Sequence, residues 1–544
     1  MTVNLAQSTY LAWLASEESN RQAQVEAYRR YYDGNPPTYL TDRMAEFLNV
    51  ERDKSFGINL AAVIVDTKVE RLNVTGFAVK DETEAEDVGG GESAEAPPAD
   101  GEVSASRAEQ VGALLDSWWQ HNRMDARQDF VYRAALRDRE AFVVVSYDEA
   151  EQRPAYSYDF AFDGTSGVRV HRKPGTYSEL AFASKRWQVD APGGESTRRL
   201  NLYFPNRIEK WVNRHADSAY NEAFWEPYTD PDEPGLVAAT ITDEFGREYE
   251  ASVAWWTEDG TETGEPLGVP IIPFINRDDG TGEGQSEIDN AIPINDGVNK
   301  TYIDMLASAD MTGFSMFWTN GQLPSNVKVY PGAMIPVAPA EGAAEGETPQ
   351  IGQLAAGNVD GLIKLQEWQV SVLAGITGTP QSRFTPAAVR PAEGTQKQEE
   401  SALVARIEGL QKVWGNAWED VQKMGLRVAR AFGPGSLPNL DGLIISTMWA
   451  EAETRNEKEH VEAVALKVDK LAVPREQAWL EVGYSADDVR KMQDMKRDEL
   501  AERVEEASAT DMGRNANALE TMGRLMGGAA AMPAFQPPQA MSRV

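Results

Sequence analysis

The chain has 544 residues, of which 42% are hydrophobic, and it carries 52 lysine and arginine against 86 aspartate and glutamate residues. The formal net charge of −34 at pH 7 repels nucleic-acid phosphates, so a basic, high-affinity DNA-binding surface is not expected. Cysteine is absent, which excludes disulfides and thiolate metal sites, and the four scattered histidines do not favour a histidine-rich metal site.

The sequence has no apolar run of about 18 residues, and its N-terminus lacks a charged stretch followed by an apolar core. We therefore expect no membrane span and no signal peptide, and place the protein in the cytosol or in an assembly made there. The mixture of helical and strand patterns along the chain predicts an α+β fold with sizeable cores.

Helical spacing of apolar residues dominates the start of the chain, and strand patterns follow it. Helices are predicted at 5–33, at 58–72 and at 107–140, the last as one helix or two. Residues 141–147 read AFVVVSY and predict a strand, because β-branched and aromatic residues favour strands. A β-rich region follows at 153–260.

Residues 80–106 consist mostly of Glu, Asp, Gly, Ala, Ser and Pro. Such a segment cannot bury enough apolar surface to offset the entropy lost on ordering it. Because helical patterns occur on both sides, we interpret it as a disordered, solvated acidic loop within a domain and not as a domain boundary.

The clearest periodic signal is a long amphipathic helix from Glu393 to Ala431. The segment contains no proline, and Gly433-Pro434 ends it. Apolar residues recur in steps of four and three, which places them on one face. They are Leu403, Ile407, Leu410, Trp414, Ala417, Val421, Met424 and Val428. The pattern alone indicates a helix in the core of a large domain.

The segments around this helix alternate between helical and Pro/Gly-rich patterns. Residues 268–274 read GVPIIPF and predict an edge strand, because proline removes the hydrogen-bond donors that an interior strand needs. Two helices are predicted at 286–311 and 358–374, with a Pro/Gly-rich excursion between them. Further predictions are strand-like pieces at 315–318, 327–330 and 441–449, helices at 454–470, 475–482 and 485–507, and a disordered tail from 527.

Signature motifs of common enzymes do not occur: no Walker lysine follows a glycine loop, and neither GxSxG nor HExxH is present. The 86 acidic residues do not by themselves define a glycosidase-like pair. The densest basic stretch, with its interleaved aromatic residues, comprises Lys185, Arg186, Trp187, Arg198, Arg199, Tyr203, Phe204, Arg207, Lys210, Trp211 and Arg214. It fits either a sheet with an aromatic core face and solvated charges, or a surface for nucleic acid or a neighbouring subunit.

Five segments, in this order and spacing, resemble elements of a known family. They are Tyr28–Gly34; Asn59–Leu72 with Gly76-Phe77; Gly268–Phe274 with Asn276-Arg277, Gly284 and Ser286–Ile288; Gly375–Pro380; and Trp449–Glu459. Together with the order of the central helices, they resemble the portal (head-to-tail connector) proteins of tailed bacteriophages, above all long-tailed phages of actinobacterial hosts. The loop at 80–106 has no counterpart and resembles an insertion.

This resemblance implies a homo-oligomeric ring, usually a dodecamer, at one vertex of the capsid. Double-stranded DNA would pass through its channel during packaging and ejection. The partners implied are the terminase packaging motor, the head–tail adaptor, the major capsid protein and a scaffold protein. The resemblance implies a virion component assembled in the host cytoplasm, with no catalytic, cofactor-binding or metal-binding residues.

The same resemblance assigns a region of the portal fold to each part of the chain. The regions are a mixed α/β wing at 1–284, first stem helix at 286–311, clip at 312–357, second stem helix at 358–375, tunnel loop at 376–396, long helix and rest of the wing at 397–449, helical crown at 450–510 and flexible tail at 511–544. The stem residues implied are Tyr302, Met305, Lys364 and Trp368. In the tunnel loop, Arg383, Arg390 and Lys397 are candidates for weak phosphate contact, or are surface charges at loop ends.

Two other interpretations stay open at this point. One is an acidic soluble hydrolase with an unidentified carboxylate site, which would require a closed pocket in a monomer or small oligomer. The other is a monomeric adaptor scaffold that binds capsid proteins without forming a channel.

Overall fold

The computed structural model describes residues 21–37, 57–81, 106–214, 225–313, 317–322, 337–339, 348–353, 359–384, 393–453 and 464–482, the longer ranges with short interruptions. The chain divides into two compact units, residues 1–453 and 454–544. In the second unit, helix α11 (Arg475–Val482) confirms the helix predicted at 475–482, and residues 464–468 are also helical. Most of the other two helices predicted there, and the tail, lie outside the described residues.

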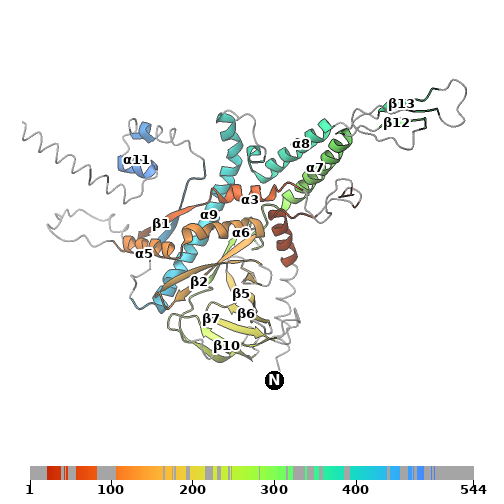
Figure 1. The fold of residues 1–544 in the computed structure, drawn as a ribbon. Helices are drawn as coiled ribbons and strands as arrows, with labels where there is room; N and C mark the ends of the chain where they lie inside the picture. The colour runs from red at the N-terminus through yellow and green to blue at the C-terminus, as the bar shows by residue number, and fades with distance from the viewer. Residues whose placement is uncertain are drawn as a thin grey trace, which may run out of the picture. The chain divides into compact units, whose positions relative to one another are not determined.

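In the first unit, helix α9 (Glu393–Phe432) packs against a three-stranded antiparallel sheet and a two-stranded ribbon (Figure 1). In spatial order, the sheet consists of β11 (Ile271–Ile275), β2 (Glu140–Asp148) and β3 (Arg153–Phe160), and the ribbon of β1 (Val74–Asp81) and β14 (Leu443–Trp449). All eight residues predicted for the apolar stripe are at most 8% exposed. The long helix, the edge position of the proline-containing strand and the strands near 141–147 and 441–449 are therefore confirmed.

Two tryptophans of α9 connect this helix by hydrogen bonds to the three-stranded sheet and to the helix that contains Tyr132. The indole of Trp414 donates to the carbonyl of Ile275 at 3.0 Å, and that of Trp418 donates to the hydroxyl of Tyr132 at 2.8 Å. The Trp414 and Tyr132 rings stack with centroids 5.4 Å apart, and Trp418 meets the edge of Phe274 at 4.7 Å. Both indoles are fully buried, so their N–H groups need these partners.

The region predicted as one helix or two contains two, α5 (Arg107–His121) and α6 (Met124–Asp138). Ser106 begins α5 with a capping box, in which its hydroxyl accepts from the Glu109 amide and Glu109 accepts in return. The break falls at Arg123, whose φ of 54° is left-handed. Most of the acidic segment, residues 82–105, lies outside the described residues.

The β-rich region forms a seven-stranded antiparallel sheet of order β4–β5–β6–β7–β10–β9, with β8 pairing β7. Its strands are β4 (Gly167–Arg172), β5 (Leu180–Val189), β6 (Thr197–Tyr203), β7 (Arg207–Asn213), β8 (Trp225–Pro227), β9 (Leu236–Thr242) and β10 (Glu248–Trp255). Lys185 pairs with Asp159 at 2.7 Å, and Trp211 is buried. The basic stretch therefore lies in a sheet, as the first interpretation predicted, with Trp211 in its core and Lys185 paired with an acidic residue. The alternative, a surface for nucleic acid or a neighbouring subunit, stays a prediction.

Two antiparallel helices, α7 (Ile292–Gly313) and α8 (Val359–Thr377), run side by side (Figure 1). The chain between them contains a ribbon of β12 (Phe317–Thr319) and β13 (Ile351–Gln353). The strand-like pattern at 315–318 is thus confirmed in part, and the one at 327–330 lies outside the described residues.

The predicted bounds of these helices were wrong by several residues. A short 3-10 helix, η2 (Asp289–Ala291), precedes α7, which begins at Ile292 and not at residue 286. Ser286 instead bonds the carbonyl of Arg137, which holds the chain in a non-helical path over α6. Helix α8 continues to Thr377, and α9 has begun by Glu393. The segment between them is therefore shorter than the predicted loop 376–396.

We predict that Trp414→Ala destabilises the fold by about 3–5 kcal/mol, because a fully buried ring and its hydrogen bond are lost. The matched control is the neighbouring Val413→Ala, since Val413 is 54% exposed and its truncation costs about 0.5 kcal/mol or less. Thermal unfolding followed by circular dichroism measures both variants. Equal melting temperatures for the two would contradict the assigned helix face.

Candidate functional site

Segments from four of the five resembling motifs meet at the base of α7 and α8. Glu287, whose side chain has no exposed surface, lies 3.3 Å from the ammonium of Lys68 and 2.6 Å from the guanidinium of Arg406. Arg277 donates to both carboxylate oxygens of Glu287, at 3.0 and 3.1 Å. Asn276 donates to the same carboxylate at 3.2 Å. We call these five residues the Glu287 cluster.

The five members of the cluster come from four different parts of the first unit. Lys68 lies in α3 (Ala61–Val69), Asn276 and Arg277 follow β11, Glu287 precedes η2, and Arg406 lies in α9. The Lys68 ammonium also donates to the hydroxyl of Thr379, just beyond α8, at 3.5 Å. The cluster therefore joins the sheet, the long helix and both paired helices at one point.

The charges in the cluster do not balance, because three cations surround one carboxylate. Burial alone would raise the pKa of Glu287, but the charges of Lys68, Arg406 and Arg277 outweigh it and lower the pKa to about 2. Burial also lowers the pKa of Lys68, and Glu287 opposes that shift. Glu287 is therefore ionised at neutral pH and is the anion on which the three cations depend.

Backbone geometry fixes the turn that carries Glu287. A Cβ at Gly284 would lie 2.5 Å from the carbonyl oxygen of Arg139 and 2.9 Å from that of Asn276, so only glycine fits there. The amide of Glu287 donates to the carbonyl of Leu136 at 2.9 Å. Arg277 has a φ of 51°, a left-handed conformation that is uncommon outside glycine. The glycine and the Asn-Arg pair of the resembling motif are thus explained by the turn they form.

Three tyrosines from the helix at 21–32 bind acidic residues around the same base. Tyr28 donates to Asp289 at 2.9 Å, Tyr31 to Asp296 at 3.0 Å and Tyr32 to Asp66 at 2.8 Å. Burial and the hydrogen bond to Asp289 raise the pKa of Tyr28 to about 12, and burial with Asp66 raises the pKa of Tyr32 to about 12. Both hydroxyls therefore keep their protons and remain donors.

The last turn of α3 and the residues after it hold the segment between α8 and α9 at both of its ends. Beyond α8, Arg383 in the short helix η3 (Gln381–Arg383) pairs with Glu70 at 2.9 Å. Near the start of α9, Glu400 lies 3.6 Å from Arg71, which also donates to the carbonyl of Ala452. The position of the chain on either side of this segment is therefore set by the residues that follow Lys68.

Of the three candidate residues of the tunnel loop, the structure describes the side chain of one, Arg383. Arg383 pairs with Glu70, so a phosphate would have to compete with that carboxylate for its guanidinium. Arg390 lies outside the described residues, and Lys397 lies in α9 with a side chain outside them. Of the stem candidates, Tyr302 and Met305 are half-buried in α7, whereas Lys364 and Trp368 are exposed on α8. None of the described candidates, Arg383, Tyr302, Met305, Lys364 and Trp368, is a member of the Glu287 cluster.

Sequence reasoning missed Arg406 and the role of Glu287. Arg406 lies beside the apolar stripe of α9 and is separated from Glu287 by 119 residues, so no local pattern marks the pair. Lys68 and Glu287 lie inside segments quoted for the resemblance. The available signal was the position of Lys68, four residues after the buried Ile64 and next to the buried Val69 in α3, because a buried lysine requires an acidic partner.

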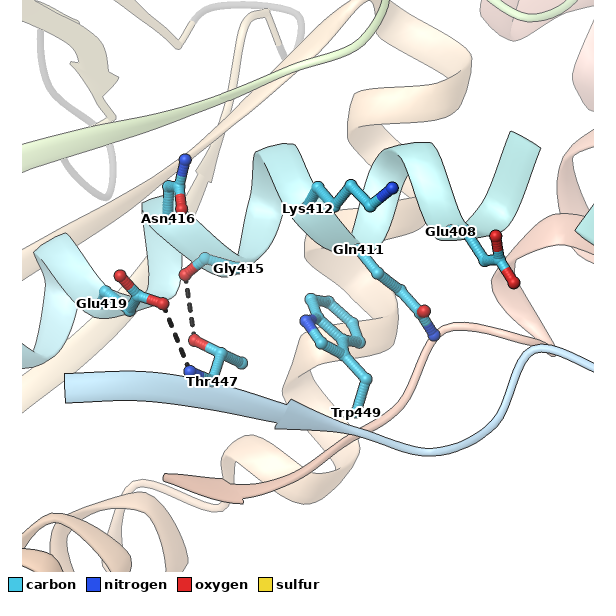
Figure 2. Close-up of a pocket in the computed structure, with 8 residues that line it drawn as sticks. All are labelled: Glu408, Gln411, Lys412, Gly415, Asn416, Glu419, Thr447 and Trp449. Atoms are coloured by element: carbon cyan, nitrogen blue, oxygen red, sulfur yellow. Dashed lines mark hydrogen bonds between the residues drawn. The ribbon is translucent and has the colours of Figure 1, made fainter. Parts of the chain in front are cut away.

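A pocket of about 420 Å³ lies between α9 and β14, and Figure 2 shows its lining. The lining residues are Glu408, Gln411, Lys412, Gly415, Asn416, Glu419, Thr447 and Trp449. Thr447 fastens the strand to the helix, because its amide donates to Glu419 at 3.3 Å and its hydroxyl to the carbonyl of Gly415 at 2.9 Å.

The pocket does not supply the carboxylate pair that the hydrolase interpretation needs. Glu408 and Glu419 lie on one straight helix, about 16 Å apart along its axis at 1.5 Å per residue. Glycosidase pairs are separated by about 5–9.5 Å. Within the described part of the chain, no group of three or more His, Asp or Glu residues is arranged to hold a metal ion. No described helix has the length and apolar character of a membrane span.

Comparison with known proteins points to the same family as the five resembling segments. The family model described as "Phage portal protein, SPP1 Gp6-like" matches residues 11–506. The portal protein of Mycobacterium phage D29 is 24% identical over 417 residues, covering 72% of this chain and 74% of that protein. The portal protein of Mycobacterium phage L5 is 22% identical over 495 residues, covering 85% of this chain and 84% of that protein.

The chain belongs to the SPP1 Gp6-like family of phage portal proteins. It is therefore a portal, or head-to-tail connector, of a bacteriophage capsid. This family is structural and non-enzymatic, and its members assemble as oligomeric rings with capsid and packaging partners. The resemblance inferred from the five segments is confirmed, as is the α+β fold class.

We predict that Glu287→Gln destabilises the first unit by about 3–5 kcal/mol, because three cations lose their anion. Lys68→Met should cost less, since the carboxylate keeps both arginines. Glu283→Gln is the control: its carboxylate is 56% exposed and pairs with Arg139, so the loss should be about 1 kcal/mol or less. The melting temperatures of the three variants rank their losses of stability. A loss for Lys68→Met at least as large as that for Glu287→Gln would show that Glu287 is not the anion on which the cations depend.

The pH dependence of the same pair tests the ionisation of Glu287. Its pKa is about 2 in the folded chain, against about 4.3 for an unperturbed glutamate. The stability it contributes is therefore complete above about pH 5 and is lost as the pH falls towards 2. The difference in melting temperature between the wild-type protein and Glu287→Gln should shrink across that window. A difference that stays constant down to pH 2 would show that Glu287 is not the titrating group.

Proposed function

We propose that twelve copies of this chain form a closed ring at one capsid vertex, around a channel that passes double-stranded DNA during packaging and ejection. The ring, assembled in the host cytoplasm, would dock the terminase motor, later the head–tail adaptor, and would contact the major capsid protein and a scaffold protein. In this proposal the paired helices α7 and α8 are the stem, the segment between them is the clip, and the segment between α8 and α9 is the tunnel loop. The remaining elements up to β14 form the wing, and the second unit contains the crown.

The observation that carries this proposal is the convergence of the resembling segments on the base of α7 and α8. The cluster and the tyrosine–aspartate bonds fix the helix pair to the sheet and to α9. A helix pair held only at its base extends beyond the body that holds it. This arrangement suits a stem that must transmit force between a clip and a wing without bending at the junction.

The charge of the chain also fits a conduit. Every lysine or arginine that neutralises a phosphate adds affinity, and a channel that gripped DNA would hold it in place. A chain with net charge −34, repeated around a ring, repels the duplex and favours sliding. Arg383 is already paired with Glu70, so it offers only a weak phosphate contact. Arg390 and Lys397 complete the set of basic residues proposed for the tunnel loop.

We predict that mass photometry of the purified protein gives a particle near twelve times 59.9 kDa, and that end-on electron micrographs show a central hole. Duplex DNA of mixed sequence should bind these rings only weakly, with an affinity that falls further as salt rises. A protein that stays monomeric at every protein and salt concentration would contradict the proposed ring and favour the adaptor or hydrolase interpretations.

A further inference from the structure

Helix α8 carries more exposed apolar surface than its packing within the chain explains. Ile363 is 43% exposed, Leu365 42%, Trp368 63% and Ile376 42%. Ile363 lies on a different side of the helix, about 160° from Leu365, whereas Leu365, Trp368 and Ile376 share one side with the half-buried Val372. By contrast, α9 is twice as long and exposes only Val413 and Phe432 among its described large hydrophobic side chains. Large exposed apolar patches on soluble proteins generally mark interaction sites.

These four residues form one stripe along the helix. Their spacing of three, four and four places them within about 80° of one another at about 100° per residue. Such a stripe is the pattern with which one helix packs on another. We call Leu365, Trp368, Val372 and Ile376 the α8 stripe.

The α8 stripe is distinct from the face of α8 that packs on α7. That face contains Val370, Leu373 and Thr377, which are buried, and its centre lies about 130° around the helix from the stripe. Gln369 beside it accepts a hydrogen bond from Thr301 of α7 at 3.2 Å. Among the described elements, those that pack substantially on α8 are α7, η2 and η3, and they leave the stripe exposed.

A third, polar face occupies the remaining side of the helix. Asp360, Lys364, Glu367 and Ser371 are all exposed, and their arc is centred about 110° from the stripe on the side away from α7. This face suits contact with water or a water-filled channel. The α8 stripe suits neither water nor a phosphate backbone, because its side chains supply no charge and, apart from one indole N–H, no hydrogen bond.

We infer that the α8 stripe is the surface of the paired helices on which the adjacent copy of this chain packs. The inference rests on the proposed ring and names part of its subunit interface. A ring built from one kind of chain needs a surface on each copy that only a neighbour can cover. With one face on α7 and another towards water, the stripe is the face of α8 left for that neighbour.

The test places glutamate on two faces of the same helix. Trp368→Glu combined with Ile376→Glu should shift the particles from rings to monomers and small oligomers, raising the protein concentration for half-assembly at least tenfold. As controls, Trp368→Glu alone and Ser371→Glu alone each add one negative charge. Trp368→Glu should already weaken assembly, whereas Ser371→Glu, on the polar face, should assemble like the wild type. Circular dichroism on the dissociated double variant checks that its helices and melting temperature are retained.

A second measurement does not depend on assembly being lost. Because the chain has no cysteine, a single Ile376→Cys or Ser371→Cys substitution gives one site for maleimide labelling. In rings, the cysteine at position 376 should label at least tenfold more slowly than the one at 371, and the difference should vanish in dissociated subunits.

The outcomes separate this inference from the proposed function. If the wild type forms rings and the glutamate double variant assembles equally well, the inference is overturned and the proposed ring is not. The same holds if the cysteines at positions 376 and 371 label at equal rates in rings. Protection at 376 that appears only when DNA is added would also overturn it, because the stripe would then line the channel. A wild-type protein that never forms rings would instead overturn the proposed function itself.

Discussion

The arrangement of the first unit depends on one buried carboxylate. Glu287 gathers Lys68, Arg277 and Arg406 from three separate elements, and no second anion shares that task among the residues that shift its pKa. Burying ions is costly, and a hydrophobic contact would stabilise a core as well or better. The ions add geometric specificity. The Glu287 carboxylate accepts hydrogen bonds from five N–H groups of Asn276, Arg277 and Arg406, and these directional bonds set the position of α7 relative to α9. An apolar contact would allow the two helices to slide past each other.

This constraint explains how an acidic, largely structural chain can support a portal role. The chain as a whole is acidic, while the cations of Lys68 and Arg406 lie at the base of the helix pair and fix it to the rest of the first unit. Beside the segment between α8 and α9, Arg71 pairs with Glu400 and the more exposed Arg383 pairs with Glu70. The helix pair itself keeps an apolar stripe and a polar face, which in the proposed ring would meet a neighbouring copy and solvent.

Much of the fold followed from periodicity and composition, and the site did not. The stripe of α9 was predictable because eight apolar residues repeat at helical spacing, and β11 because its prolines favour an edge. The start of α7 was misplaced because Ser286 and Glu287 bond α6, a tertiary effect that overrides local helix preference. The pair of Arg406 with Glu287 spans 119 residues, and single-sequence patterns contain no information on such contacts. The family resemblance marked the segments but not the point where they meet.

The most direct test of this account is electron cryomicroscopy of the purified particle at side-chain resolution. The account predicts a ring in which every copy keeps the ammonium of Lys68 and the guanidinium groups of Arg277 and Arg406 around a buried Glu287, with α7 and α8 paired beside a central channel. A particle without a channel, or a ring in which Glu287 is exposed to solvent and separated from these cations, would contradict it.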